Sequence, residues 1–280
     1  DSHTHLDMVA AEGGVVPAAA PAPAAAAGEG RSADGAPAAD PAAQIAAATA
    51  VGVDRLVQVG TDLPSSRWAV ALAEAYPTVV AAVGLHPNDA PRPPDLDEAL
   101  RQLEALAAHP RVRALGETGL DTFRTGPPGR AAQEASFRAH IAIAKRYGKA
   151  LVIHDREAHA DVLRILDEEG APDRVVMHCF SGDAEFADEC LRRGFVLSFS
   201  GTVTFKNAVG VREAARRCPP ERMLVETDAP YLTPVPWRGR RNGPYLVPLT
   251  VRALAEIAGH DLDRLCAALS ATAERTFGPW

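Results

Sequence analysis

Six residues of types that bind metal ions lie at the ends of short apolar runs in this sequence. Imidazole and carboxylate groups are the side chains that hold zinc, manganese and similar divalent ions in proteins. Two of the histidines, His3 and His5, are two residues apart, and side chains two apart in a strand point the same way. These two imidazoles can therefore bind one cation together. The six candidate metal ligands are His3, His5, Glu117, His154, His178 and Asp228.

Six ligands are more than one closed tetrahedral site needs. Two ions about 3.5–4 Å apart would use all six and would leave positions for water and substrate, with one carboxylate shared between the ions. We assign the shared position to Glu117 and expect Asp228 to accept a proton from the attacking water. The sequence therefore predicts two divalent cations, with Mg²⁺, Mn²⁺ and Zn²⁺ as candidates, and Asp228 and Glu117 as catalytic carboxylates.

The elements that should position these residues form a repeating pattern along the sequence. Apolar, β-branched runs alternate with amphipathic helical stretches, which predicts right-handed βαβ units and a parallel sheet. A first strand that ends near residues 1–2 would bring the number of strands to eight, as in an α/β fold of the TIM-type (β/α)₈ barrel, whose strand tips converge on one face. A doubly wound open sheet would need a Gly-rich phosphate turn after the first strand, and none is present. The other predicted strands are 55–60, 79–87, 112–121, 150–155, 174–182, 195–201 and 222–230.

One stretch differs from the rest of the chain. Residues 9–48 are dominated by Ala, Pro and Gly, with few large apolar side chains. Such a composition cannot bury enough surface to offset the entropy lost on ordering. We therefore expect a single barrel domain over residues 1–280 that carries a flexible surface insertion at about 9–48.

The formal net charge of -7 excludes a protein that grips nucleic acid by bulk electrostatics. Any nucleic acid would need a local basic patch. Guanidinium groups bind phosphate oxygens through paired hydrogen bonds, and the segment WRGRRNGP and the residue two after His154 supply them. The candidate substrate-binding residues are Arg156, Arg238, Arg240, Asn242 and His86.

Other features point to a cytoplasmic protein. The sequence contains no apolar run long enough to span a membrane, and no basic segment followed by an apolar stretch at its start. None of the four cysteines forms a C-x-x-C pair, so reduced thiols are expected. We expect a monomer without a membrane or an obligate protein partner. Four histidines in helical or loop contexts receive no role: His109, His140, His159 and His260.

Six motifs in succession give the chain a resemblance to a known family. SHTHLD, GETGLD, VIHDRE, MHCFSG, FSGTVTF and LVETDAPYLTPVPWRGRRNGP resemble the signatures of the TatD family of metal-dependent deoxyribonucleases, from residue 1 to about residue 260. The resemblance implies an amidohydrolase-like (β/α)₈ barrel with two divalent metals. It further implies that one ion is held by His3, His5 and Asp228, the other by His154 and His178, and that Glu117 bridges them.

The function expected from these residues is hydrolysis of DNA phosphodiester bonds by a metal-activated water, in the manner of a 3'-5' exonuclease on single-stranded DNA. An alternative is hydrolysis of an ester or amide bond, such as an aminoacyl-tRNA ester. Many barrels with that chemistry bridge their metals with a modified lysine, but here the only lysines are Lys145, Lys149 and Lys206, none at the tip of the fourth strand. A third alternative, a non-catalytic scaffold with a vestigial metal site, should have lost ligands, whereas all six are present.

Overall fold

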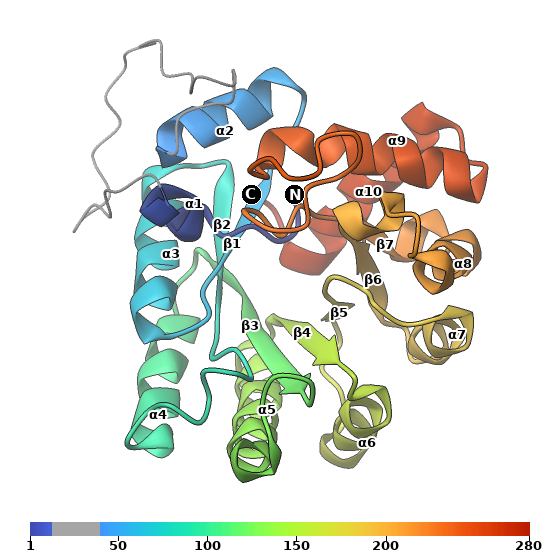
Figure 1. The fold of residues 1–280 in the computed structure, drawn as a ribbon. Coiled ribbons are helices and arrows are strands. Elements are labelled where there is room, and N and C mark those ends of the chain that lie inside the picture. The colour runs from blue at the N-terminus through green and yellow to red at the C-terminus, as the bar shows by residue number, and fades with distance from the viewer. Residues whose placement is uncertain (13–39) are drawn as a thin grey trace.

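A curled parallel sheet forms the centre of the computed structural model, which describes residues 1–12 and 40–280. Its seven strands are all parallel and follow one another in sequence order. Figure 1 shows the strands in the middle and the helices around them. The prediction of an α/β barrel is therefore confirmed. The strands are β1 (Leu56–Val59), β2 (Val79–Val83), β3 (Val112–Asp121), β4 (Ala150–Arg156), β5 (Val175–Met177), β6 (Val196–Phe199) and β7 (Met223–Val225).

The position of the eighth strand, between β7 and β1, is occupied by the first residues of the chain. Thr4 forms isolated parallel bridges with Gln58 on one side and Ala229 on the other. The backbone nitrogen of Ser2 also donates a hydrogen bond to the carbonyl oxygen of Val225. The eighth strand is thus present only as bridges and not as a regular strand, because a helix begins directly afterwards at Leu6.

Helices connect the strands, and several begin at an aspartate. The carboxylates of Asp62, Asp95, Asp183 and Asp261 accept hydrogen bonds from backbone N–H groups in the first turn of four helices, which stabilises those helix starts. The helices that surround the sheet are α3 (Leu63–Ala75), α4 (Leu96–Ala107), α5 (Pro127–Tyr147), α6 (His159–Glu169), α7 (Ala184–Arg192), α8 (Val209–Arg217), α9 (Val247–Ala258) and α10 (Leu262–Phe277), with 3₁₀ turns η1 (Gly201–Thr204), η2 (Pro220–Arg222) and η3 (Pro244–Leu246).

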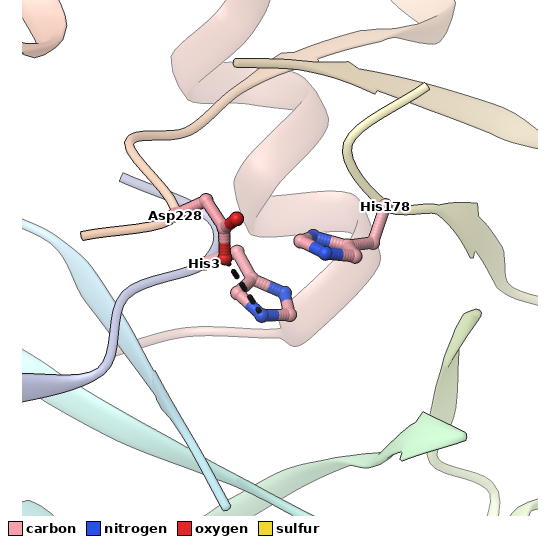
Figure 2. A group of neighbouring side chains, drawn as sticks. All are labelled: His3, His178 and Asp228. Atoms are coloured by element: carbon pink, nitrogen blue, oxygen red, sulfur yellow. Dashed lines mark ion pairs between the residues drawn. The ribbon is translucent and has the colours of Figure 1, made fainter. Parts of the chain in front are cut away.

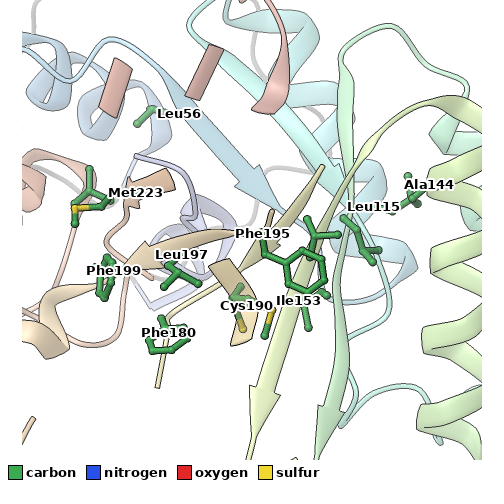
Figure 3. Packing of buried hydrophobic residues seen from close by; sticks show 14 of the residues in the cluster. Leu56, Leu115, Ala144, Ile153, Phe180, Cys190, Phe195, Leu197, Phe199 and Met223 are labelled. Carbon is green, nitrogen blue, oxygen red and sulfur yellow. The ribbon is translucent and has the colours of Figure 1, made fainter. Parts of the chain in front are cut away.

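The core has two layers because side chains alternate along each strand. One set, which includes Ala150 and Val152 of β4, packs inside the barrel. The other set, which includes Leu151 and Ile153, packs against the helices. Figure 3 shows part of this outer layer, with hydrophobic side chains from β3, β4 and β6 buried together. His154 comes two residues after Val152 and shares its face of β4. Its side chain therefore points to the interior, at the carboxyl end of the strand.

Helices occupy both ends of the stretch 9–48, which the sequence predicts to be a flexible insertion. Helix α1 covers Leu6–Glu12 and helix α2 covers Pro41–Ala50. Asp40 caps α2, proline occupies its first turn, and Ile45 is buried. Alanine is the best helix former, so this Ala-rich segment needs few large side chains to fold against its neighbours, α1 and η3. Residues 13–39 lie outside the described residues. Within the described parts of the chain, no helix has the length and apolar character needed to cross a membrane.

Candidate metal centre

A cavity of about 660 Å³ opens at the carboxyl ends of the strands. Five of the six predicted ligands line it, and the sixth, His3, is completely buried directly beside them. Figure 2 shows His3, His178 and Asp228 pointing toward one another, and the rings of His3 and His178 stack with their centroids 3.5 Å apart. The polar residues that line the cavity include His5, His86, Asn88, Glu117, Asp121, Arg124, His154, Arg156, His178 and Asp228.

Four side-chain atoms surround one small space at the base of the cavity. Nε2 of His3 and Nε2 of His5 are 3.1 Å apart. Oε2 of Glu117 lies 3.4 Å from the first and 3.8 Å from the second of these nitrogens. Oδ1 of Asp228 lies 3.9 Å and 3.6 Å from the same two atoms. Ligands bonded at about 2.1 Å in a tetrahedron are about 3.4 Å apart, so the separations among His3, His5 and Glu117 fit a single cation.

The ring of His5 is oriented for metal binding. Its Nδ1 lies 2.9 Å from the carbonyl oxygen of Val59, which accepts a hydrogen bond and leaves Nε2 facing the cavity. Burial lowers the pKa of His5, but the close carboxylate of Asp228 and the charge of Glu117 outweigh it and raise the pKa to about 9. The negative potential that holds a proton on His5 is also what would hold a cation, which must displace that proton.

The other oxygen of Glu117 faces a different group of histidines. Oε1 lies 2.8 Å from Nδ1 of His154 and 3.5 Å from Nε2 of both His178 and His86. The two oxygens of one buried carboxylate therefore face different imidazoles, with His3 and His5 on the Oε2 side, although the rings of His3 and His178 stack on each other. This is the geometry that a carboxylate shared by two ions requires.

Glu117 reaches the interior only because β3 carries one extra residue. Leu115 pairs with Leu151 and Thr118 pairs with Ile153, so three steps along β3 match two along β4. Such a bulge inverts the alternation of side chains that follow it. Leu115 packs against the helices, so regular alternation would have turned Glu117 the same way.

A glycine is needed at this bulge. Gly116 has a φ of +132°, and a Cβ atom there would lie 2.3 Å from the carbonyl oxygen of Val152. Both the backbone conformation and the lack of space therefore exclude a larger residue.

Two buried carboxylates behind the histidines were missed by the sequence analysis. Oδ2 of Asp121 lies 3.4 Å from Nε2 of His154, and Oε1 of Glu226 lies 2.9 Å from Nδ1 of His178. Carboxylates in such positions orient metal-binding imidazoles. Both lie within motifs noted in the sequence, GETGLD and LVETD, and Glu226 is two residues before Asp228. That spacing was the signal that could have revealed Glu226.

The network around Asp121 fixes its position. Asn88 donates a hydrogen bond from Nδ2 to Oδ2, and the backbone N–H groups of Phe123 and Arg124 donate to Oδ1. Burial raises the pKa of Asp121, but the nearby His154 and the hydrogen bonds from the backbone and Asn88 together hold the pKa well below its usual range. Asp121 is therefore a charged acceptor at neutral pH.

Uncommon backbone conformations gather around the cavity. A non-glycine residue with a positive φ is rare and costly, and such residues cluster at functional sites. Asp228 has a φ of 55°, Cys179 one of 42° and Leu232 one of 57°, and all three line the cavity. The fourth case, Glu157 with a φ of 56°, directly follows Arg156. The backbone around the predicted ligands is thus held in strained conformations by the surrounding fold.

The predicted substrate-binding residues fall into two groups. Arg156 and His86 line the cavity, whereas Arg238, Arg240 and Asn242 are not among its lining residues. The guanidinium of Arg238 lies 3.8 Å from the ring centre of Phe205, and that of Arg240 lies 4.6 Å from the ring centre of Trp237.

Asn242 is fully buried, so its amide does not face solvent. Nδ2 of Asn242 donates hydrogen bonds to the carbonyl oxygens of Thr227 and Tyr231. The structure thus places this side chain inside the loop that carries Asp228, where it holds the backbone. The basic, Asn-containing sequence of this loop had suggested a phosphate contact because the sequence does not show which way the amide points.

Comparisons with known proteins agree with this geometry. Residues 1–278 match the family model described as TatD related DNase. A metal-dependent hydrolase named TatD from Mycobacterium tuberculosis, described as uncharacterised, is 48% identical over 235 residues, which are 82% of this chain and 88% of the relative. A protein from Citrobacter rodentium named 3'-5' ssDNA/RNA exonuclease TatD is 38% identical over 242 residues, 84% of this chain and 90% of the relative.

The solved structure of YJJV, a TatD homologue from Escherichia coli K12, covers 84% of this chain and 91% of its own, with a TM-score of 0.79 at 28% identity. A barrel with buried histidine and carboxylate clusters at the carboxyl ends of its strands, together with these relatives, defines a metal-dependent hydrolase. The chain belongs to the TatD family. The resemblance seen in the sequence motifs is thereby confirmed.

Proposed function

We propose that this protein is a deoxyribonuclease that hydrolyses phosphodiester bonds of single-stranded DNA from the 3' end. The observation that carries the proposal is the division of Glu117 between two sets of histidines at the base of a cavity lined by arginines. The relative from Citrobacter rodentium, which is named as a 3'-5' exonuclease of single-stranded DNA and RNA, supports the choice of substrate.

The donor set suits two divalent cations. Imidazole nitrogens and carboxylate oxygens are ligands for zinc and manganese, and carboxylates also serve Mg²⁺. Two cations bound here would lower the pKa of a water molecule and neutralise charge on the phosphoryl group. One would be held by His3, His5 and Asp228, the other by His154 and His178 with His86 nearby, and Glu117 would contact both.

Asp228 is suited to accept the proton of the attacking water. Burial raises the pKa of Asp228, but the nearby imidazoles of His5, His178 and His3 outweigh it and lower the pKa. The carboxylate is therefore ionised at neutral pH and has a free proton-accepting capacity. The positive φ of Asp228 and the amide of Asn242, which binds the backbone of the same loop, keep it at the cavity.

The distribution of arginines supports an anionic substrate. Arg124 and Arg156 line the cavity, and within residues 1–12 and 40–280 neither has a carboxylate at ion-pair distance. Several arginines of the outer helices, in contrast, form ion pairs with neighbouring carboxylates, as does Arg92 with Asp89 in the cavity wall. A protein with a net charge of -7 therefore keeps unpaired cations where a phosphate would enter. The neutralised pairs include Arg130–Asp161, Arg138–Glu169, Arg164–Glu168, Arg193–Asp167 and Arg217–Asp188.

The test is cleavage of a single-stranded DNA oligonucleotide labelled at its 5' end, with Mg²⁺, Mn²⁺ or a chelator. We expect metal-dependent shortening in single-nucleotide steps, and a rate lowered about 10²- to 10⁴-fold in Asp228→Asn, the range for loss of a general base. Asp167→Asn is the matched control, because Asp167 is an exposed partner of Arg193 on the outside of the barrel.

An unchanged rate in Asp228→Asn would overturn the assignment of the base. Failure to cleave any oligonucleotide, by protein shown to bind metal, would overturn the nuclease. A screen of aminoacyl-tRNA and simple amides would then follow. None of the three lysines of this chain lines the cavity, which argues against the form of amide hydrolase that bridges its metals with a modified lysine.

A further inference from the structure

An exposed aromatic ring lies beside the cavity. Phe123 lies two residues after the end of β3, and its side chain is 59% exposed, the second largest exposed fraction among the large hydrophobic residues of the described chain. A large apolar ring left in water next to a polar cavity is a candidate contact for a ligand. Phe123 is not part of the buried core, so hydrophobic packing does not explain why an aromatic residue lies here.

One face of this ring is covered by a cation from the cavity wall. The guanidinium carbon of Arg156 lies 4.0 Å from the centre of the Phe123 ring, and Arg156 itself lines the cavity. The stack of arginine on aromatic ring joins the cavity to the exposed ring. The ring's remaining exposure gives a flat apolar surface with a positive charge next to it.

The loop that carries the ring is held in place before any ligand arrives. The backbone N–H of Phe123 donates to Oδ1 of Asp121 over 3.0 Å, and the neighbouring Thr122 donates from its backbone and its hydroxyl to the carbonyl oxygens of Arg156 and Glu157. The other carboxylate oxygen of Asp121 lies 3.4 Å from His154. One carboxylate therefore ties the ring to the candidate metal centre.

The distance between Phe123 and the candidate metal centre suits adjacent parts of one nucleotide. Two residues of extended chain span at most about 7 Å, so the Cα atom of Phe123 lies within that distance of the Cα atom of Asp121. Arg124, next to Phe123, also lines the cavity and has no ion-pair partner among the described residues. A phosphate at the metal centre would thus have an aromatic surface and two guanidinium groups, those of Arg124 and Arg156, close by.

We propose that Phe123, backed by Arg156, is a stacking subsite for an unpaired base of the substrate, and that it makes the enzyme select single strands. The inference rests on the proposed function and deepens it. A base in a duplex is already stacked and paired, so its face is not available to the ring. Stacking of a base on an aromatic side chain changes affinity by about 5- to 150-fold and tolerates every base.

The test removes the Phe123 ring by substitution and the DNA base by an abasic site, each separately. Binding of a labelled single-stranded DNA oligonucleotide is measured by fluorescence anisotropy in EDTA, for the intact strand and for strands with one abasic site at successive positions. We expect Phe123→Ala to weaken binding of the intact strand about 5- to 150-fold, while one of the abasic strands binds both proteins equally. Phe123→Trp should restore the dependence on the base.

A matched control is Tyr147→Ala, which removes another exposed aromatic side chain at the end of α5, away from the cavity lining. It should leave binding unchanged. The KM for cleavage with Mn²⁺ should rise in Phe123→Ala while kcat stays within about twofold, as expected for loss of a contact made equally in the ground and transition states.

The outcomes separate this proposal from the nuclease itself. Cleavage with no difference between Phe123→Ala and the unchanged protein, or equal weakening for intact and all abasic strands, overturns the subsite and leaves the nuclease. Base-dependent binding that Phe123→Ala abolishes, without cleavage, supports the subsite and overturns the nuclease. Protein that neither binds nor cleaves the strand overturns both.

Discussion

Oε1 of Glu226 lies 2.9 Å from Nδ1 of His178, and both side chains are buried. The carboxylate is fixed by a hydrogen bond from the hydroxyl of Ser198 to Oε2 and by one from the backbone N–H of Cys179 to Oε1. The charge of Glu226 is therefore held against one edge of the imidazole. The opposite nitrogen, Nε2, is directed at Glu117, 3.5 Å away.

This relationship predicts that Glu226→Gln weakens metal binding without unfolding the protein. The substitution keeps the shape of the side chain and removes the charge that orients His178 and increases its basicity. Loss of such a partner lowers metal affinity about 10- to 100-fold. Titration of the metal-free protein with Mn²⁺ or Zn²⁺ against a competing chelator measures the effect.

The control for this prediction is Glu256→Gln, which removes the charge of an exposed glutamate on α9. It should bind metal as the unchanged protein does. Equal affinities for Glu226→Gln and Glu256→Gln would show that the carboxylate behind His178 has no influence on the metal.

A second prediction concerns the bulge that turns Glu117 into the cavity. Gly116→Ala would place a Cβ atom 2.3 Å from the carbonyl oxygen of Val152, at a φ of +132°. Backbone strain of about 1–3 kcal/mol and overpacking of about 1–3 kcal/mol together predict a loss of about 2–6 kcal/mol in the free energy of unfolding. Urea denaturation measures it.

The matched control is Gly52→Ala. Gly52 also has a positive φ, +86°, but a Cβ atom there meets nothing within 4 Å. Only the conformational cost of about 1–2 kcal/mol should remain. If the two variants lost the same stability, the close approach of β3 and β4 at Gly116 would not be a constraint on the site.

A third prediction concerns pH and a histidine far from solvent. His140 on α5 is fully buried, its Nε2 accepts a hydrogen bond from the backbone N–H of Leu85, and its Nδ1 donates to the carbonyl oxygen of Ser136. Burial lowers its pKa from 6.5 to about 4, against a small opposing effect of the hydrogen bond to Ser136. The unfolded state therefore binds a proton more readily than the folded state between these values.

Stability should fall as the pH decreases from 6.5 toward 4, because the unfolded chain gains a proton that the folded chain cannot accept. The contribution of His140 amounts to about 3 kcal/mol over this range at 1.36 kcal/mol per pH unit. Urea unfolding in EDTA at pH 7, 6, 5 and 4 should show a shallower dependence for His140→Gln than for the unchanged protein. Parallel curves would contradict the prediction.

The strands were the part of the fold most open to prediction. The run 112–121 coincides with β3, and the run 150–155 differs from β4 by one residue. Such runs are recognisable because burial on both faces of a parallel strand demands a continuous apolar sequence. Helix α2 was missed because an alanine-rich segment carries little apolar signal, although its cap, Asp40, and its buried Ile45 were present in the sequence.

The sequence by itself determined the family, the order of the strands and the kinds of ligand at their ends, because these depend on local composition and spacing. The tertiary structure decided the direction of Glu117, which regular alternation would have turned toward the helices and which a mismatch with β4 turns inward. It also placed Asp121 and Glu226 behind their histidines and turned Asn242 into its own loop. The first three depend on atoms of another strand, and Asn242 depends on carbonyl groups earlier in its own loop. No local pattern contains that information.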